Sequence, residues 1–258
     1  MRRRPSAADL SLRTSGRYGL RRVCRRRLTA YACPSLRLPG AAETYRYLSW
    51  KGGVLAQMEI DLSRIAARDA HDLLTSAVVP RPIAWVSSVS ADGQVNLAPF
   101  SFFSGVTWSP PTLCVSIVNR QDGSRKDTIL NIDETGNFVV NMVSEEMGSV
   151  MVETSATVPR GVDEAREAGV SLIPSTVVMA PRVRDAGIAF ECVLDRIIQV
   201  GTGPYGANLV LGRIRVMHVN KELLESESSI DWKRSRLLGR LSGTKYCRLR
   251  SVIEISPQ

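Results

Sequence analysis

Short runs of β-branched and aromatic residues, separated by turn signals, constrain the fold of this chain more than any other feature. Residues 78–90 read V-V-P-R-P-I-A-W-V-S-S-V-S, and residues 94–103 read Q-V-N-L-A-P-F-S-F-F. Asp92-Gly93 lies between them. An Asp-Gly pair between two runs of this kind is a strong hairpin signal. The sequence therefore predicts that the two runs pair as an antiparallel hairpin.

Four more strand-like runs follow, at residues 112–118, 137–143, 190–200 and 209–219. In the third of these, apolar Phe190, Cys192 and Leu194 alternate with charged residues, which predicts one wet face. Helices are expected at 145–153 and 162–168, with a short helical or irregular lead-in over 62–74. The pattern predicts a mainly β domain, an antiparallel β-barrel with helices attached.

One more helix is expected to start near Ser124 and to end at Gly136. Ser124-Arg125-Lys126-Asp127 has the spacing of a capping box, with Asp in place of the usual Glu. Gly136 is well placed as the residue just past the helix end.

The positive charge of the chain is concentrated at its N-terminus. The formal net charge is +9, yet residues 1–57 alone hold twelve arginines and one lysine against Asp9 and Glu43. The other 201 residues hold 21 basic and 23 acidic side chains. A nucleic-acid-binding role is therefore not expected for the body of the chain.

Residues 1–57 are expected to form an Arg-rich arm without regular structure, followed by one domain over 58–258. Three interpretations of the arm remain open: a targeting sequence, a nucleic-acid-binding arm, or a start codon assigned too early. The last interpretation rests on Met58, after which the composition becomes ordinary. Lys51-Gly52-Gly53 lies just upstream, and its codons are necessarily purine-rich, like a bacterial ribosome-binding site.

The cysteines, the histidines and the hydropathy of the chain argue against disulfides, a metal site and a membrane helix. None of the five cysteines forms a Cys-x-x-Cys pair, and Cys114 and Cys192 lie in apolar runs. Free thiols and a cytoplasmic location are therefore expected. His71 and His218 are far apart in sequence, so no metal site is expected. No apolar run reaches the ~18–20 residues of a membrane helix.

Residues 201–206 read G-T-G-P-Y-G and match the G-x-G-x-x-G pattern. A dinucleotide-binding fingerprint needs a helix directly after it. A-N-L-V-L-G-R-I follows instead and is strand-like. We therefore interpret this segment as a hairpin connection.

Residues 124–128, S-R-K-D-T, combine two cations and two hydroxyls with the free N–H groups of a helix start. Such a set suits the phosphate of a cofactor such as FMN. The alternative is a capped surface helix with no ligand. In N-L-A-P-F-S, Asn96 can donate and accept hydrogen bonds, Pro99 interrupts strand pairing, and small Ala98 allows a flat ring to approach the backbone. An irregular edge strand is the alternative for that segment.

Three segments in a fixed order resemble the flavin reductase-like family, which includes flavoredoxin. They are residues 80–103 (P-R-P-I-A-W through N-L-A-P-F-S-F-F), 109–117 (S-P-P-T-L-C-V-S-I) and 125–141 (R-K-D-T through N-F-V-V-N). Glu191-Cys192 and the late L-L-G-R-L-S-G-T-K-Y extend the likeness, which runs from about Met58 to about Arg248. The resemblance implies an FMN-binding split β-barrel that forms a homodimer, with the flavin near the subunit interface.

The resemblance also assigns roles to residues. It implies that the flavin ring and ribityl chain contact Asn96, Leu97, Ala98, Pro99, Phe100 and Ser101. It implies that the phosphate contacts Arg125, Lys126, Asp127 and Thr128. Arg81 and the backbone of Ser116 and Ile117 are secondary candidates. No acid–base side chain is required, because the hydride chemistry belongs to the flavin.

Four further residues with aromatic rings carry expectations of their own. His218 is a candidate for the nicotinamide site, although alternation places it with Ile214 and Val216 on an apolar face, where a structural histidine is the usual finding. Tyr246 is a candidate cover for the flavin. Trp85 and Trp108 are expected in the core.

Two functions compete for the flavin domain. One is an NAD(P)H-dependent flavin reductase, with the variant that it supplies reduced flavin to a partner monooxygenase. The other is an FMN-binding electron-transfer protein of the flavoredoxin kind, without significant reductase activity. No motif specifies the choice between NADH and NADPH, and none specifies the electron acceptor.

Overall fold

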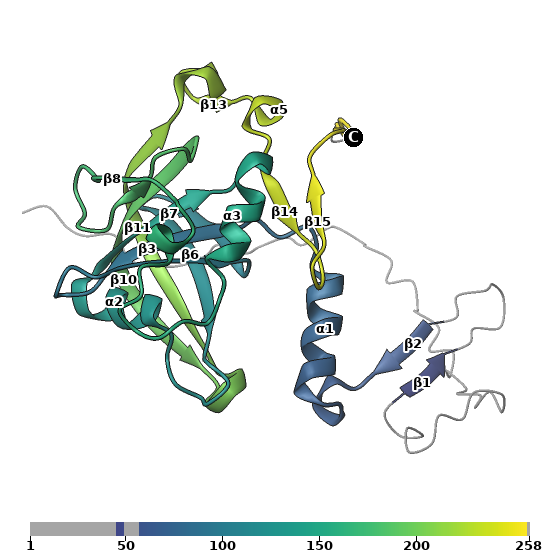
Figure 1. Ribbon diagram of the computed structural model, residues 1–258. Helices are drawn as coiled ribbons and strands as arrows, with labels where there is room; N and C mark the ends of the chain where they lie inside the picture. The colour runs from purple at the N-terminus through teal and green to yellow at the C-terminus, as the bar shows by residue number, and fades with distance from the viewer. Residues whose placement is uncertain (1–44, 49–56, 257–258) are drawn as a thin grey trace, which may run out of the picture. The chain divides into compact units, whose positions relative to one another are not determined.

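The computed structural model describes residues 45–48 and 57–256, and the chain divides into two compact units, Met1–Ile65 and Ala66–Gln258. In the first unit, strand β1 (Tyr45–Leu48) pairs antiparallel with β2 (Gln57–Ile60), and the one-turn helix η1 (Leu62–Arg64) follows (Figure 1).

Strand β1 differs from the expectation that residues 1–57 lack regular structure. Its four residues, Y-R-Y-L, find a partner strand that includes Met58, so the predicted boundary falls inside β2. Four residues are too few for periodicity to be recognised in the sequence alone. The rest of the arm, 1–44 and 49–56, lies outside the described residues.

The second unit is built on one antiparallel sheet of seven strands, in the order β4-β3-β7-β10-β11-β6-β5. Their bounds are β3 Ala84–Val89, β4 Val95–Phe100, β5 Phe103–Trp108, β6 Pro111–Val118, β7 Asn137–Met142, β10 Ile188–Val200 and β11 Ala207–Val219. The predicted hairpin at Asp92-Gly93 is confirmed, because β3 pairs with β4 from Ala84↔Phe100 to Val89↔Val95.

The sheet is curled into a barrel. The two edge strands, β4 and β5, are separated in sequence only by Ser101 and Phe102. Three residue steps span at most about 10 Å, so the sheet must bend until its two edges nearly meet. The predicted mainly β, antiparallel fold is confirmed.

Strand β3 is buried on both faces, which explains its nearly continuous apolar run. Ala84 and Val86 belong to a cluster with Ile117 and Phe138, while Trp85 on the opposite face belongs to a second cluster. Trp85 is fully buried and its indole donates to Thr154 Oγ1 at 2.8 Å, as expected of a core tryptophan.

The helices and short strands lie outside the sheet. The helices are α1 Ala67–Ala77, α2 Asp127–Thr135, η2 Glu145–Met147, α3 Gly148–Glu153, α4 Glu164–Glu167, η3 Gly203–Tyr205, η4 Lys221–Leu223 and α5 Trp232–Ser235. Three two-stranded ribbons complete the unit: β8 Leu172–Ile173 with β9 Arg182–Val183, β12 Leu224–Ser226 with β13 Ser229–Ile230, and β14 Leu238–Arg240 with β15 Tyr246–Arg248.

Three local expectations can be compared with this structure. Helix α2 begins at Asp127 with Lys126 as its N-cap residue, so the capping box at Ser124 is wrong; the Ser124 hydroxyl instead donates to Asp122. The helix ends as expected at Gly136, which has φ +70° and donates to Ile132 O. Residues 201–206 connect β10 to β11, as expected.

Trp108 corrects another expectation, because it is 90% exposed rather than buried. It ends β5, an edge strand that has only β6 as a neighbour and is exposed along nearly its whole length. Apolar character predicted burial here, but an edge strand on the outside of the barrel has no core to enter.

Candidate functional site

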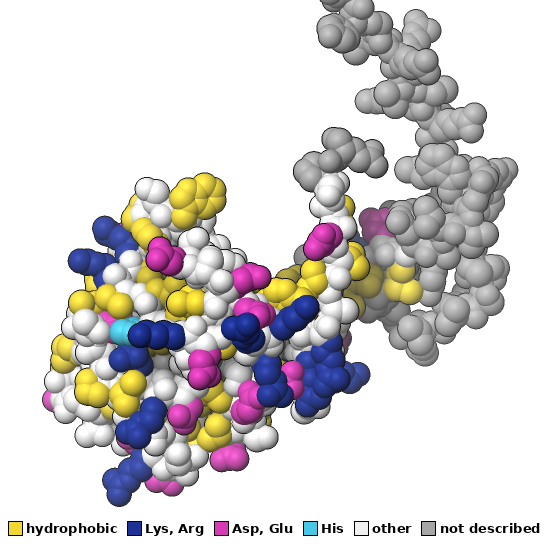
Figure 2. Space-filling view, turned by 90° about the horizontal axis from the view of Figure 1, so that it is seen from above, with side chains coloured by type: hydrophobic (Ala, Val, Ile, Leu, Met, Phe, Trp, Pro, Cys, Tyr) yellow, Lys and Arg dark blue, Asp and Glu magenta, His cyan; other side chains and the backbone are white. Residues whose placement is uncertain are grey.

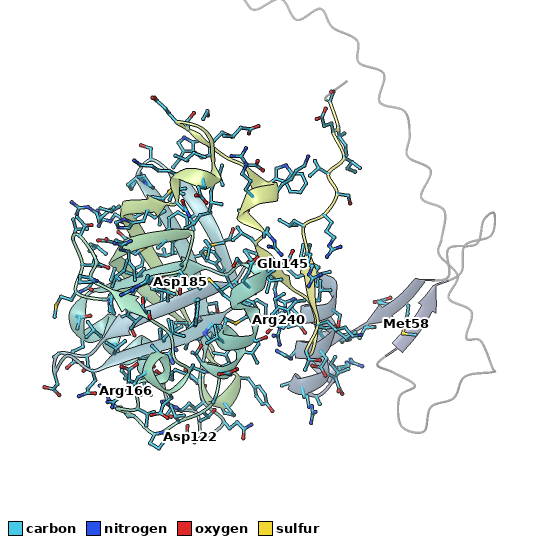
Figure 3. All side chains as sticks on the ribbon, turned by 45° about the horizontal axis from the view of Figure 1, so that its top comes forward. Met58, Asp122, Glu145, Arg166, Asp185 and Arg240 are labelled. Carbon is cyan, nitrogen blue, oxygen red and sulfur yellow. The ribbon has the colours of Figure 1, made fainter. Side chains whose placement is uncertain are left out.

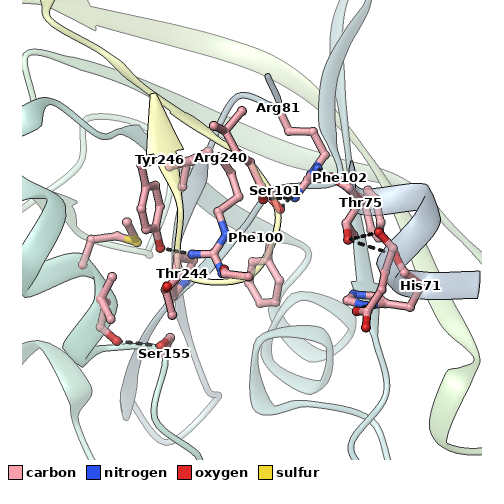
Figure 4. A pocket seen from close by; sticks show the side chains of 17 residues that line it. His71, Thr75, Arg81, Phe100, Ser101, Phe102, Ser155, Arg240, Thr244 and Tyr246 are labelled. Atoms are coloured by element: carbon pink, nitrogen blue, oxygen red, sulfur yellow. Dashed lines mark hydrogen bonds and ion pairs between the residues drawn. The ribbon is translucent and has the colours of Figure 1, made fainter. Parts of the chain in front are cut away.

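A cavity of about 540 Å³ opens beside the end of strand β4 (Figure 4). It is lined by His71, Asp72, Thr75, Arg81, Ile83, Pro99, Phe100, Ser101, Phe102, Met151, Val152, Ser155, Arg240, Leu241, Gly243, Thr244 and Tyr246. Its volume falls in the ~300–1,000 Å³ range of small-molecule sites. The lining comes from α1, the end of β4, α3 and the β14–β15 hairpin, which are distant in sequence.

Arg81 joins three of these walls. Its guanidinium donates to Thr75 O at 2.6 Å, near the end of α1, and to Leu241 O at 2.9 Å, in the β14–β15 turn. Its Nε donates to Ser101 Oγ at 3.3 Å. The residue is only 5% exposed, and burial, followed by the charge of Arg240, lowers the pKa of Arg81. Arg81 therefore positions the walls of the cavity.

Arg240 lies in the same cavity and is held in place by its own hairpin. Its guanidinium packs over the Tyr246 ring, 4.5 Å from the centroid, and donates to the Tyr246 hydroxyl and to Gly243 O. Backbone hydrogen bonds in both directions, at 3.0 and 2.8 Å, tie Arg240 to Arg81. In Figure 4 the Arg240 and Tyr246 side chains meet at the cavity wall.

The start of helix α2 is brought against strand β4, as the sequence suggested. Asn96 Nδ2 donates to Thr128 Oγ1 at 2.9 Å, and Lys126 Nζ lies 5.8 Å from the centroid of the Phe100 ring. Burial, followed by the charge of Arg120, lowers the pKa of Lys126. Because Phe100 also lines the cavity, the proposed phosphate and ring ends of the site are adjacent.

Arg120 organises the turn before α2 and was missed by the sequence reasoning. It donates to Arg125 O at 2.6 Å and to Asp127 Oδ2 at 2.7 Å. No side chain caps the helix, and two buried polar atoms near its start, Arg125 Nε and Asp127 Oδ1, have no hydrogen-bond partner within the described residues. No motif in the sequence singles out Arg120, because a separation of seven residues from its partner Asp127 is not a recognisable spacing.

The two cations of the R-K-D-T segment point to different surroundings. Lys126 contacts Phe100, whereas Arg125 forms an ion pair with Asp133 at 2.8 Å and lines a separate, more polar cavity of about 350 Å³. The structure therefore places Lys126, and not Arg125, beside the 540 Å³ cavity.

Beneath strand β4 lies Glu164, which is 8% exposed and accepts a hydrogen bond from Leu97 N at 3.1 Å. Burial raises the pKa of Glu164, and the nearby charges of Asp127 and Asp163 add to the rise, while backbone donors including Leu97 oppose it. Because β4 is an edge strand, this carboxylate occupies the place of a missing strand neighbour.

The other sequence candidates are placed as follows. Pro99, Phe100, Ser101, Arg81 and Tyr246 meet in the 540 Å³ cavity. The Leu97 and Ile117 side chains are fully buried in the core, so only their backbones are available to a ligand. Ala98 and Ser116 are partly buried and do not line the cavity; Ser116 N donates to Phe102 O at 2.8 Å.

His218 is not brought to the cavity. Its Nε2 lies 2.6 Å from Glu191 Oε1, and Glu191 is fully buried. Burial alone would raise the pKa of Glu191, but donors at Thr176 N and Val177 N, together with His218, outweigh it and hold that pKa below its usual value. Through the bonds from Thr176 N and Val177 N, Glu191 holds the segment before β9 against the barrel.

The cavity residues not predicted from the sequence are His71, Asp72, Thr75, Ile83, Phe102, Met151, Val152, Ser155, Arg240, Leu241, Gly243 and Thr244. Most of them come from α1 and the β14–β15 hairpin, two elements with weak sequence signals. Helix α1 was expected only as a short lead-in ending at 74, and the three-residue strands β14 and β15 were not expected at all. The L-L-G-R-L-S-G-T-K-Y segment was noted, but nothing in it singled out Arg240.

The described part of the chain also limits other kinds of site. It contains no group of three or more His, Cys, Asp or Glu residues arranged to hold a metal ion, and no helix long and apolar enough to cross a membrane. Cys114, Cys192 and Cys247 are free thiols, and burial raises the pKa of Cys192 far above its usual value.

The model of the flavin reductase like domain family matches residues 75–237. A protein of Aquifex aeolicus (strain VF5), itself uncharacterised, is 38% identical over 191 residues, covering 74% of this chain and 95% of that protein. The chain therefore belongs to the flavin reductase-like family.

Two solved structures share both sequence and fold with the chain. Nitrilotriacetate monooxygenase component B from Bacillus cereus is 35% identical, with a TM-score of 0.75, covering 78% of this chain and 100% of that one. The 2-nitrobenzoate 2-nitroreductase NbaA from Pseudomonas fluorescens is 33% identical, with a TM-score of 0.70, covering 78% and 96%.

Proposed function

We propose that this chain binds FMN, reduces it with NADH or NADPH, and supplies reduced flavin to a partner monooxygenase. The observation that carries the proposal is the contact of Lys126 with Phe100, which joins a cationic, uncapped helix start to the aromatic wall of the 540 Å³ cavity. The likeness to a monooxygenase component B over the whole of that chain supports the partner.

The residues present fit the chemical demands of FMN. Lys126 and the free N–H groups of the first turn of α2 suit a phosphate, because no side chain caps these N–H groups. Phe100 and Pro99 form a flat apolar wall for the ring. The bound flavin would supply the hydride chemistry, while the chain orients it and excludes water.

The exposed edge strand β5 supports a homodimer. Val106 and Trp108 on this strand are 52% and 90% exposed, and a bare edge with exposed apolar groups is a surface that proteins usually cover. Trp108→Asp is expected to shift the protein from dimer to monomer in analytical ultracentrifugation, while Trp232→Asp, remote from β5 in sequence, leaves the dimer intact. A wild-type monomer at micromolar concentration would contradict the dimer.

The test of the function is an anaerobic titration followed in the visible spectrum. The purified protein should be yellow or become so with FMN, and its flavin absorbance should bleach at turnover rates on adding NADH or NADPH. A yellow protein that stays oxidised would favour the alternative, an FMN-binding electron carrier. A colourless protein that cannot be loaded with FMN would overturn both.

A further inference from the structure

Arg81 and Arg240 are two positive charges in one cavity wall, and neither is neutralised. Arginines elsewhere in this unit, such as Arg120, Arg125 and Arg236, form ion pairs with carboxylates at 2.7–3.1 Å. Within the described residues, no carboxylate lies at ion-pair distance from Arg81 or Arg240. Asp72, which also lines the cavity, lies 3.1 Å from His71.

The two guanidinium groups differ in how many of their N–H donors remain without an acceptor. Arg81 is almost fully buried and directs its N–H groups at Thr75 O, Val78 O, Leu241 O and Ser101 Oγ. Arg240 is half-buried and stacked on Tyr246, and its two recorded acceptors leave N–H donors unused. Arg240 is therefore a pre-oriented cation with hydrogen-bonding capacity to offer a ligand.

The phosphate of FMN does not account for this charge. We propose that this phosphate binds at the start of α2, where Lys126 lies, and Figure 3 shows Asp122, in the loop before α2, in a different part of the unit from Arg240. The free donors of Arg240 can therefore serve a second anionic group at the β14–β15 end. The neighbouring wall is aromatic and apolar, with Phe100, Phe102 and Ile83, so the anion would be carried on a flat ring.

We propose that Arg240, backed by the charge of Arg81, forms a subsite for the anionic group of the molecule that exchanges electrons with the flavin. Its ligand is an aromatic or heteroaromatic ring bearing a carboxylate or a phosphate. The role in electron exchange rests on the proposed function, whereas the preference for an anion rests on the cavity alone. A charge-assisted hydrogen bond to a guanidinium is roughly twice as strong as a neutral one, which gives the subsite its discrimination.

The experiment compares ligand pairs that differ in charge. Calorimetric titration of the FMN-loaded protein uses benzoate against benzamide, and nicotinamide mononucleotide against nicotinamide riboside. At least one anion should bind about tenfold more tightly than its neutral partner. The pair that shows the preference identifies the source, an aromatic carboxylate or a nucleotide phosphate. Equal binding within both pairs overturns the proposal.

Variants locate the preference. Arg240→Gln should abolish it, Arg240→Lys should retain part of it, and Arg215→Gln, which removes an exposed arginine of β11 outside the cavity, should leave it intact. A preference that survives in folded Arg240→Gln overturns the assignment. The comparison of charged and neutral ligands on the wild-type protein tests the proposal even if a variant fails to fold. The same titration of flavin-free protein separates the two claims, because failure to bind FMN leaves the anion preference measurable.

Discussion

The two ends of the candidate site are assembled in opposite ways. The start of α2 takes its cations and N–H groups from consecutive residues, 124–128, whereas the cavity collects residues from His71 to Tyr246. One end is a local motif placed by a single helix, and the other exists only after the barrel, α1 and the β14–β15 hairpin have come together. Local chemistry is therefore readable in the sequence, and the cavity is a property of the tertiary structure.

Charged side chains of both signs are mixed over the surface of the second unit, so charge alone does not mark the cavity. Figure 2 shows basic and acidic side chains interspersed over the face in view, so this face has no large patch of one charge. The charges on Arg81 and Arg240 differ from these because no carboxylate of the described residues lies at ion-pair distance from either, although Asp72 also lines the cavity.

Arg81→Met should break the cavity and destabilise the fold. It removes the donors to the carbonyls of Thr75, Val78 and Leu241, and buried acceptors without donors cost about 1–3 kcal/mol each. A loss of about 3 kcal/mol or more is expected, lowering Tm by roughly 6–12 °C at ~2–4 °C per kcal/mol. Calorimetry measures it, with Arg215→Met as the control. A change in unfolding free energy within ~0.5 kcal/mol, like that of an ordinary surface substitution, would show that Arg81 does not hold the cavity walls together.

Lys126→Ala should weaken FMN binding about tenfold or more, since a hydrogen bond to a charged group contributes roughly 1.5–3 kcal/mol. Riboflavin lacks the phosphate, so its affinity should hardly change. Arg125→Ala should have a smaller effect on FMN, because Arg125 is already paired with Asp133. Fluorescence titration with both flavins measures these affinities. Equal losses for FMN and riboflavin would indicate damage to the fold instead of lost phosphate recognition.

Glu164 offers the smallest and most discriminating effect, through its hydrogen bond to strand β4. Glu164→Ala leaves Leu97 N without an acceptor and should cost about 1–3 kcal/mol, whereas Glu164→Gln keeps an acceptor oxygen and should cost less than about 1 kcal/mol. Thermal unfolding of both variants measures the difference. Similar losses for the two variants would mean that the carboxylate, and not the hydrogen bond to Leu97, matters.

The pH dependence of Glu164 has a defined sign. Its pKa is raised above 4.5 in the folded state, so the folded chain binds the proton more tightly than the unfolded chain. Its contribution to stability is complete below pH ~4.5 and declines as pH rises through the folded-state pKa. The Tm of wild type relative to Glu164→Gln should therefore fall as pH rises above about 4.5. A difference that grows with pH would contradict this assignment.

Much of the barrel could be predicted from the sequence because its signals are local. Asp92-Gly93 fixed the β3–β4 hairpin, and Gly136 ended α2 by adopting a left-handed conformation. Both features need only neighbours in sequence. The family resemblance, and not a local pattern, implied that R-K-D-T and N-L-A-P-F-S serve one site, and in the structure Asn96 donates to Thr128.

What could not be predicted depends on long-range partners. Arg81 reaches Leu241, 160 positions away, and no pattern around either residue announces the pairing. Trp108 was expected in the core because apolar character does not distinguish an edge strand from a central one. The hydrogen bond between His218 and Glu191 likewise depends on the register of β10 against β11, which is interrupted by an irregularity at Glu191/Cys192.

We propose that an FMN phosphate binds at the start of α2 while the ring occupies the cavity beside Phe100. The decisive measurement is the ratio of the wild-type affinities for FMN and riboflavin, obtained by titration of flavin-free protein. We expect both flavins to bind and FMN to bind about tenfold or more tightly, because only FMN carries the phosphate. Equal affinities, or a protein that binds neither flavin, would contradict it.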